Sequence, residues 1–317
     1  MTLALVTPNP DLDITLRRLG RGPDREIEIE LAAEAAGGKA NNAARLLAVL
    51  GHDCTVLGFS GGWVGHRIEE LLRAAGVRCA LTPIGQPSRF YVTISDTAGV
   101  RQLSYHAPGP RVDEAETASL LAAIAAIAED ASRVLIGGSI PPGVSDDWYQ
   151  AAVRAAGPER VWVDAAGPNL RAALRGGARR VKVNLRELWE LAEAAGAPDP
   201  RRVGRRIARV AELHGMELLG VTLGRAGAVG WFDGRLTWAA GVPIEVKNTV
   251  GAGDAFMAGM LHAEALGGDL AEQLRWGVAV ASALCEQVDP AAVSAERIRQ
   301  LVDRVVVRSG ERSNRSS

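Results

Sequence analysis

The sequence predicts an α/β protein in which helices cover both faces of a mostly parallel central sheet. From residue 114 onward, helical and apolar strand patterns alternate: a helix at 114–129 precedes a strand at 133–136, and a helix at 146–156 precedes a strand at 161–164. This alternation is typical of βαβ units, whose strands form parallel sheets. The alternating apolar and polar segments before residue 107 follow a different rhythm, which predicts a small separate sheet projecting from the core.

The first third of the chain contributes core strands as well as this small sheet. A strand at 3–6 is stopped by Pro8 and Pro10. Helices closed by glycine are expected at 43–50 and 66–75, with core strands at 54–59 and 77–84. The segments assigned to the small sheet are 14–19, 25–31, 88–95 and 100–106, the last two as a hairpin.

The second half continues the regular βα pattern to its end. The elements expected there are a strand at 180–183, helices at 186–195 and 203–214, strands at 218–223 and 242–247, and helices at 255–266, 272–285 and 295–306. A further hairpin is centred on Asp233-Gly234. No repeat or linker interrupts residues 1–307, so we expect one domain, followed by a polar tail at 308–317 that we expect to be disordered.

Composition excludes several classes of function. The 317 residues carry a formal net charge of −1, which gives no basic excess for nucleic acid. The longest apolar segments, 120–128 and 278–285, are too short to span a membrane, and no secretory signal precedes the first strand. The three cysteines lack metal spacing and fit a reducing compartment. A cytoplasmic protein that binds neither nucleic acid nor membrane is therefore expected.

The segment Asn248-Thr249-Val250-Gly251-Ala252-Gly253-Asp254 contains the main chemical signal. It joins the predicted strand at 242–247 to the start of an apolar helix. Gly251 and Gly253 lack a Cβ atom, so their backbone N–H groups can approach an anion, and a helix start adds unpaired donors. Asp254 is either an ordinary helix cap or a base beside a phosphate cradle, which is the arrangement that phosphoryl transfer to a hydroxyl requires.

Several other polar residues follow predicted strands, and ligands of open α/β sheets bind at the carboxyl ends of strands. These residues are Asp13, Ser139, Asn184, Glu187, Thr222, Gly224 and Asp254. Each also has a structural interpretation. Asp13 can satisfy loop amides, and Asn184 with Glu187 has the spacing of a capping box, although Glu187 also suits hydrated Mg²⁺. The glycines of Thr222-Leu223-Gly224-Arg225-Ala226-Gly227 form either a plain turn or a backbone bed for a nucleotide.

Three residues of the first hundred could bind an anion or a polar ligand. Lys39 lies between Gly37-Gly38 and a helix start, where it is either an anion ligand or a solvated charge. Asn42 can cap that helix or bind ligand. Arg89 lies on one face of the predicted hairpin, and its forked guanidinium suits a phosphate, although exposed sheet arginines are often only surface residues.

In combination, these motifs resemble the ribokinase-like (PfkB-type) carbohydrate kinase family. The order GGKxxN, NxxE, TxGxxG and NTVGAGD covers the chain from Thr7 to about Cys285. Within the family, four stretches are most similar to the 1-phosphofructokinases. They are Thr7-Pro8-Asn9-Pro10 with Asp13, Gly58-Phe59-Ser60-Gly61-Gly62 with Gly65, His106-Ala107-Pro108-Gly109-Pro110, and Gly138-Ser139-Ile140-Pro141-Pro142-Gly143.

The resemblance implies a three-layer α/β/α ribokinase-like core with a β lid at approximately 14–36 and 89–106, and the use of ATP and Mg²⁺. It implies that Asp254 is the catalytic base and that the backbone of Gly251, Ala252 and Gly253 holds developing negative charge. It places the sugar at Asp13, Gly38, Lys39 and Asn42, and the sugar's phosphate at Arg89, Lys39 and Ser139. It places ATP at Lys182, Asn184, Thr222, Gly224, Gly227, Thr249, Gly251 and Gly253, and the metal at Glu187 and Asn184.

The implied reaction is the ATP-dependent phosphorylation of a ketohexose phosphate, with fructose 1-phosphate converted to fructose 1,6-bisphosphate. Alternatives are a tagatose-6-phosphate or fructose-6-phosphate kinase, a free-sugar kinase, and a non-catalytic sugar-binding relative. Lid strands in this family often build a homodimer, which is expected here too. Three positions depart from the family pattern: Ala40 and Asn41 in the sugar loop, and Asn248, where an aspartate often helps to bind a monovalent cation. The last departure argues against cation activation.

Overall fold

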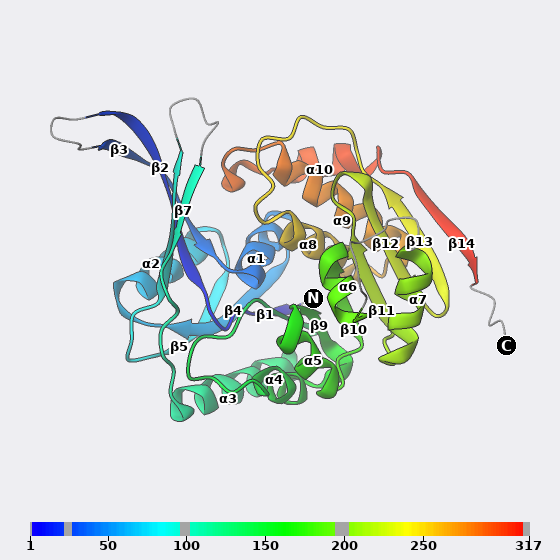
Figure 1. Ribbon diagram of the computed structural model, residues 1–317, viewed down its shortest axis with the longest axis horizontal. Helices are drawn as coiled ribbons and strands as arrows, with labels where there is room; N and C mark the ends of the chain where they lie inside the picture. The colour runs from blue at the N-terminus through cyan, green and yellow to red at the C-terminus, as the bar shows by residue number, and fades with distance from the viewer. Residues whose placement is uncertain (1, 22–26, 96–101, 194–202, 313–317) are drawn as a thin grey trace.

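A ten-stranded sheet forms the centre of the computed structural model, which describes residues 2–21, 27–95, 102–193 and 203–312 (Figure 1). The strands lie in the order β5 (Arg78–Pro83), β4 (Asp53–Ser60), β1 (Thr2–Val6), β8 (Arg133–Gly137), β9 (Val161–Asp164), β10 (Arg180–Asn184), β11 (Leu218–Thr222), β12 (Gly227–Phe232), β13 (Arg235–Ala240) and β14 (Val307–Arg312). Neighbours from β5 to β11 are parallel, and those from β11 to β14 are antiparallel. The predicted mostly parallel sheet is confirmed.

Helices cover both faces of this sheet, as the βα alternation predicts. One face is covered by α1 (Lys39–Val49), α2 (Gly62–Ala74), α8 (Ala252–Ala265), α9 (Leu270–Cys285) and α10 (Ala295–Val302). The other face is covered by α3 (Glu114–Asp130), α4 (Trp148–Ala156), α5 (Gly167–Arg175), α6 (Leu185–Leu191) and α7 (Val203–Leu213). Short 3-10 turns lie at Pro158–Arg160, Gly224–Ala226 and Pro290–Ala292.

Alternate side chains of each core strand enter different apolar layers. In β1, Leu3 and Leu5 pack with the first helix group, whereas Ala4 and Val6 pack with the second. The period of two in a strand thus fills both cores from one segment. The predicted three-layer α/β/α arrangement is confirmed. In the part of the chain that the structure describes, no helix is both long and apolar enough to cross a membrane.

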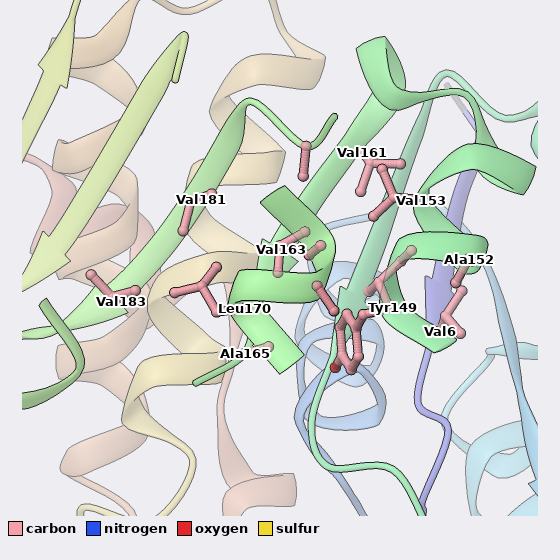
Figure 2. Packing of buried hydrophobic residues seen from close by; sticks show 14 of the residues in the cluster. Val6, Tyr149, Ala152, Val153, Val161, Val163, Ala165, Leu170, Val181 and Val183 are labelled. Carbon is pink, nitrogen blue, oxygen red and sulfur yellow. The ribbon is translucent and has the colours of Figure 1, made fainter. Parts of the chain in front are cut away.

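The core beneath α4 and α5 fixes the strands that end near the candidate site (Figure 2). Val163 of β9 and Val181 of β10 are fully buried there, and so is Tyr149 of α4. Fully burying one such apolar side chain stabilises the fold by roughly 1.5–3 kcal/mol. The Tyr149 hydroxyl donates a 2.6 Å hydrogen bond to the carbonyl oxygen of Gly138, in the loop after β8. Packing therefore holds this loop as well as the strands.

A second, four-stranded sheet projects from the core as a lid (Figure 1). Its order is β3 (Ile27–Gly37), β2 (Asp11–Arg21), β6 (Arg89–Ser95) and β7 (Gln102–His106). The predicted hairpin is confirmed as the antiparallel pair β6 and β7. The strands reach farther toward the core than 14–36, because β2 begins at Asp11 and β3 ends at Gly37. The base of the lid thus joins the loop after β1 to the start of α1.

The predicted strand at 242–247 is wrong. These residues form no strand, although Val242, Ile244 and Val246 alternate with other residues. The backbone N–H groups of Lys247 and Asn248 instead donate to the carbonyl oxygen of Cys285, at 2.8 and 3.2 Å. The segment is therefore held by the end of α9 rather than by a neighbouring strand.

The predicted disorder of the tail is wrong for residues 308–312. Strand β14 pairs with β13 and forms the edge of the central sheet. Polar side chains are compatible with an edge strand, which leaves one side open to water. Residues 313–317 lie outside the described residues. The sequence analysis also missed helix α5, which begins with Gly167-Pro168, a favourable helix start.

Candidate active site

The candidate site lies at the carboxyl edge of the central sheet, where the strand order reverses. The chain proceeds from β1 to β4 and β5 on one side, and then returns to β8 on the other side of β1. Such a switch point is where open α/β sheets bind ligands. The loop after β1 leads to Asp11, the loop after β8 contains Ser139, and Asp164 ends β9.

Helix α8 begins at this edge with a set of free backbone donors. Gly251, its N-cap, has a left-handed backbone with φ of 77°, which glycine adopts without a steric penalty. Among the described residues, the N–H groups of Gly251, Gly253 and Asp254 have no hydrogen-bond partner, whereas Ala252 N–H donates to the Thr249 carbonyl oxygen at 3.3 Å. A Cβ atom on Gly253 would lie 2.8 Å from Nζ of Lys182. The helix start is therefore a concave site for an anion.

Asp254 lies in the first turn of α8 and is 9% exposed. Its Oδ2 accepts a 2.8 Å hydrogen bond from Nδ2 of Asn42 on α1. Burial and the nearby Asp164 raise the pKa of Asp254 to about 6, although Lys182, Asn42 and Lys39 oppose this shift. A carboxylate that titrates this close to neutral pH is suited to accept a proton from a hydroxyl.

Asp164 is fully buried and forms ion pairs with two lysines. Its Oδ1 lies 2.7 Å from Nζ of Lys39, and its Oδ2 lies 2.8 Å from Nζ of Lys182. Burial favours the neutral acid, yet the two lysines lower the pKa of Asp164. Burial also disfavours the charge of Lys39, but Asp164 and Glu187 outweigh it and raise the pKa of Lys39. Lys39 thus remains charged beside Asp254.

Asp164 is absent from the predicted site, although its position carries the same signal as two predicted residues. Like Asn184 and Thr222, it is a polar residue at the end of a predicted strand. Asn9, Asp11 and Arg45 are likewise absent from the predicted site. They lie in or beside segments that were selected, so only spatial proximity distinguishes them from ordinary loop and helix residues.

Asn184 and Glu187 form a capping box at the start of α6, as the structural interpretation predicts. Oδ1 of Asn184 accepts from Glu187 N–H at 3.0 Å, and Oε2 of Glu187 accepts from Asn184 N–H at 2.8 Å. Oε1 of Glu187 takes no part in the capping box and forms an ion pair with Nζ of Lys39 at 3.9 Å. Among the described residues, no cluster of three or more His, Cys, Asp or Glu side chains could hold a metal. One buried carboxylate oxygen fits Mg²⁺ that is bound mainly by water and phosphates.

The base of the lid brings the predicted sugar ligands together. Gly38 has φ of 106° and precedes α1, which carries Lys39 and Asn42. A Cβ atom on Gly37 would lie 2.5 Å from Oδ2 of Asp13, so this carboxylate lies directly over the glycine. Burial and the neighbouring Asp11 raise the pKa of Asp13 to about 7, against the opposing charges of Arg45 and Arg89.

Arg89 and Ser139 lie on the same side of the site and are linked by Asn9. Nδ2 of Asn9 donates to Oγ of Ser139 at 3.2 Å, and the Asn9 carbonyl oxygen accepts from NH2 of Arg89 at 3.1 Å. NH2 of Arg89 also lies 2.8 Å from Oδ2 of Asp11. Two of the three predicted phosphate ligands, Arg89 and Ser139, therefore form one connected polar group, which already contains a carboxylate. The third, Lys39, pairs with Asp164 instead.

The predicted nucleotide ligands beyond Lys182 and Asn184 occupy neighbouring segments. Thr222 ends β11 and is the register partner of Asn184 at the end of β10. Gly224 begins the 3-10 turn after β11 and Gly227 follows that turn, both with positive φ. Thr249 is exposed and precedes α8. Their contacts do not join them to Asp254 directly, and their role in binding ATP stays a prediction.

The fold and the site together define a class of enzyme. A buried carboxylate with a raised pKa lies beside free helix N–H groups and two lysines that pair with Asp164, and this arrangement is suited to phosphoryl transfer onto a hydroxyl. A family model for pfkB family carbohydrate kinases matches residues 12–297. The chain belongs to this family, and it is a phosphotransferase with an alcohol group as acceptor.

Named relatives and solved structures agree with this assignment over most of the chain. A 1-phosphofructokinase of Haloferax volcanii is 33% identical over 282 residues, covering 87% of this chain and 88% of the relative. The ATP-dependent 6-phosphofructokinase isozyme 2 of Mycobacterium tuberculosis is 28% identical over 302 residues, covering 94% and 88%. The structure of phosphofructokinase-2 from Escherichia coli in complex with potassium has a TM-score of 0.86 at 25% identity, covering 95% and 98%.

Asp164→Asn is expected to destabilise the fold by roughly 3–5 kcal/mol, because it leaves the buried ammonium of Lys182 without its counter-ion. Urea unfolding at pH 8 measures the change. A matched control is Asp53→Asn, which removes the partner of Arg78 in a pair whose side chains are 54% and 58% exposed. The control should lower the free energy of unfolding by less than about 1 kcal/mol. Equal effects of the two variants would contradict the central role of Asp164.

Asp254→Asn is expected to have the opposite effect to Asp164→Asn: it should raise the free energy of unfolding at pH 8. The folded-state pKa of about 6 exceeds the ordinary value of 3.8. The folded state therefore binds more protons between these values, and native stability falls as pH rises through this window. A neutral amide avoids the cost of burying an ionised carboxylate at this position, which is on the order of 1–3 kcal/mol at pH 8. Urea unfolding at several pH values should show the gain at pH 8 and its loss below pH ~4.

Proposed function

We propose that this chain is an ATP-dependent sugar-phosphate kinase that converts fructose 1-phosphate to fructose 1,6-bisphosphate. The observation that carries the proposal is the position of Asp254, whose pKa of about 6 suits a general base. Free N–H groups of the α8 start lie in the same turn. The Haloferax relative named 1-phosphofructokinase supports the choice of acceptor.

In the proposed reaction, Asp254 accepts the proton of the C6 hydroxyl as that oxygen attacks the γ-phosphorus of ATP. A new P–O bond forms to the sugar while the bond to the β-phosphate oxygen breaks, which leaves ADP. The Gly251 and Gly253 N–H groups donate to the transferred group, where negative charge develops. Asn42 holds the carboxylate of Asp254 in position through its 2.8 Å hydrogen bond.

ATP and its metal are assigned to the side of the site formed by β10, β11 and α6. Mg²⁺, when bound, neutralises charge on the phosphate oxygens. Glu187 would hold it through Oε1 and bound water, next to Asn184. The proposed nucleotide ligands are Lys182, Thr222, Gly224, Gly227 and Thr249, together with the start of α8.

The acceptor is assigned to the side formed by the lid and α1. Asp13, Gly38 and Asn42 would bind the sugar hydroxyls, and Arg89 with Lys39 and Ser139 would bind its phosphate. This division places the two substrates on opposite sides of Asp254. A second candidate function is a kinase whose acceptor is a ketohexose 6-phosphate, such as fructose 6-phosphate or tagatose 6-phosphate. The relative named ATP-dependent 6-phosphofructokinase isozyme 2 favours this candidate. It uses the same base and differs only in sugar orientation.

The lid is proposed to hold two copies of this chain together as a homodimer. Its strands expose a row of large apolar side chains, each at least 47% exposed: Leu19, Ile27, Ile29, Leu31, Leu103 and Tyr105. Large contiguous apolar patches of this kind mark interaction sites on soluble proteins. A second lid would cover them with a matching surface.

Asp254→Asn should lower kcat by at least ~10²-fold, the usual contribution of a positioned base. An ADP-release assay with saturating Mg²⁺–ATP measures it, with fructose 1-phosphate, fructose 6-phosphate, tagatose 6-phosphate and free fructose as acceptors. The ratio of kcat/KM between these acceptors decides the substrate. Near-normal turnover by the variant would remove Asp254 from its role, and no turnover by the native chain would refute the kinase assignment.

Leu31→Glu should shift the native chain from dimer to monomer, because it places a charge in the apolar lid surface. Light scattering after size-exclusion chromatography measures the mass. Leu213→Glu is the control, since Leu213 is 74% exposed on α7 and lies outside the lid. A dimer that survives Leu31→Glu, or a native chain that is monomeric at high concentration, would contradict the lid interface.

A further inference from the structure

Arg89, the proposed ligand of the acceptor's phosphate, already has a counter-ion within the chain. Asp11 and Arg89 are register partners on the parallel strands β2 and β6, at the base of the lid. Oδ2 of Asp11 lies 2.8 Å from NH2 of Arg89, and the two side chains are only 13% and 22% exposed. Burial raises the pKa of Asp11, whereas Arg89 and His106 oppose this shift. The fold therefore keeps a carboxylate on the guanidinium that should receive a phosphate.

The guanidinium is nevertheless not fully satisfied. Its Nε is buried and has no hydrogen-bond partner among the described residues, and neither has Oδ1 of Asn9. Asn9 is 7% exposed and connects Arg89 to Ser139. A guanidinium offers five N–H donors in a fork that matches two oxygens of a phosphate. The remaining donors and the Asn9–Ser139 link indicate that a ligand belongs here in addition to Asp11.

The position of Asp11 is set by the backbone around it. A Cβ atom on Gly37 would lie 2.0 Å from Oδ1 of Asp11 and 2.5 Å from Oδ2 of Asp13. Both carboxylates of β2 thus lie over the end of β3, where only glycine leaves them room. An anion bound at Arg89 would therefore have to share this cation with Asp11.

We propose that Asp11 is a specificity-determining residue: it competes with the acceptor's phosphate for Arg89 and so sets the KM for phosphorylated sugars. This inference rests on the proposed function. The carboxylate neutralises Arg89 when no phosphate is present, and repels a dianion that binds there. Binding sites can gain specificity from a protein group that carries the same sign of charge as the ligand and therefore repels it. The opposite possibility is that Asp11 only orients Arg89, in which case its loss would weaken phosphosugar binding.

Asp11→Asn tests the two possibilities, because an amide oxygen can still accept from Arg89 but carries no charge. We expect KM for fructose 1-phosphate to fall roughly tenfold, the scale of one charge-assisted hydrogen bond, with kcat unchanged. KM for free fructose should not change. Inorganic phosphate should become a correspondingly stronger competitive inhibitor. Glu30→Gln is the control, since Glu30 pairs with Arg17 in the same sheet at 2.9 Å on the exposed surface, and it should alter none of these constants.

A double-mutant cycle with Arg89→Ala identifies the route of the effect. In the Arg89→Ala background, Asp11→Asn should lower KM for the phosphosugar much less than it does in the native chain, because only the direct repulsion remains to be relieved. A higher or unchanged KM in Asp11→Asn, or a KM that falls equally with and without Arg89, would overturn the inference. If Asp11→Asn does not fold, Asp11→Ser gives the same comparison with a neutral side chain. A native chain that phosphorylates no phosphosugar would instead refute the proposed function, so the two failures are distinguishable.

Discussion

The buried ion bridge of Asp164 with Lys39 and Lys182 is the interaction on which the rest of the site depends. Lys39 belongs to α1 and Lys182 to β10, so one carboxylate fixes two segments that are far apart in the sequence. Removing these charges from water is expensive, and the cost is offset only while each keeps its partner. Gly137, the register partner of Asp164, leaves room beside the bridge, because a Cβ atom there would lie 3.3 Å from Cβ of Lys39 and would crowd that side chain.

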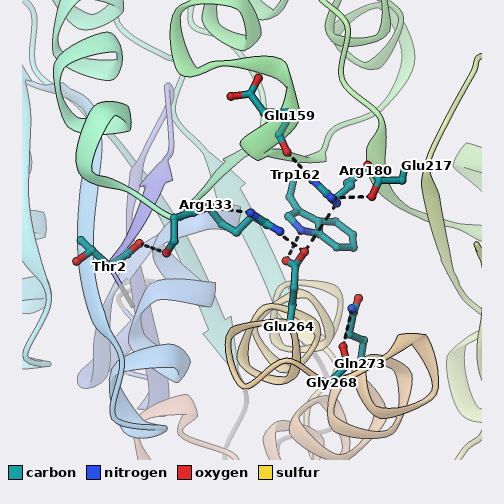
Figure 3. A network of polar contacts seen from close by, with 10 residues as sticks. Thr2, Arg133, Glu159, Trp162, Arg180, Glu217, Glu264, Gly268 and Gln273 are labelled. Carbon is teal, nitrogen blue, oxygen red and sulfur yellow. Dashed lines mark hydrogen bonds and ion pairs between the residues drawn. The ribbon is translucent and has the colours of Figure 1, made fainter.

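Helix α8, which carries Asp254, is itself held in place at its start, in its middle and near its end. At its start, Asn42 binds Asp254. Near its end, Glu264 accepts hydrogen bonds from Nε of Arg133 at 3.0 Å and from Nε1 of Trp162 at 2.8 Å (Figure 3). In between, a Cβ atom on Gly259 would lie 2.4 Å from the carbonyl oxygen of Trp276, so α8 and α9 are in backbone contact. A helix fixed in this way can hold a carboxylate in a surrounding that raises its pKa.

The sequence predicted the layers, and it nominated most residues of the candidate site, because both depend on local patterns. Apolar periodicity separates strands from helices, and motif order locates Asp254, Lys39 and Glu187. Two other features depend on partners distant in the sequence, and local patterns did not reveal them. The alternation at 242–247 resembles a strand, but Lys247 and Asn248 bind Cys285 instead. The tail looked too polar for structure, but β13 supplies backbone partners for β14.

The pairs within the site were equally hidden, because each is made by segments that are separate in the chain. Asp164 ends a strand like several other polar residues, and only the fold shows that two lysines converge on it. Arg89 was expected to be free for a phosphate, and only strand register reveals that Asp11 lies beside it. Residue type and spacing can identify a charged side chain as a candidate site residue. Its ion-pair partner depends on which segments the fold brings together, and the sequence pattern does not show this.

The charged groups of the site nearly balance one another, so net charge does not explain how the site could bind anionic substrates. The acids are Asp11, Asp13, Asp164, Glu187 and Asp254, and the bases are Lys39, Arg45, Lys182 and Arg89, so five acids meet four bases. The site thus has no net positive charge when all groups are ionised. Burial and the neighbouring Asp11 raise the pKa of Asp13, so protonation of this carboxylate relieves the excess of negative charge. Binding of phosphates must therefore rely on directed donors, above all the N–H groups of α8, rather than on a general positive field.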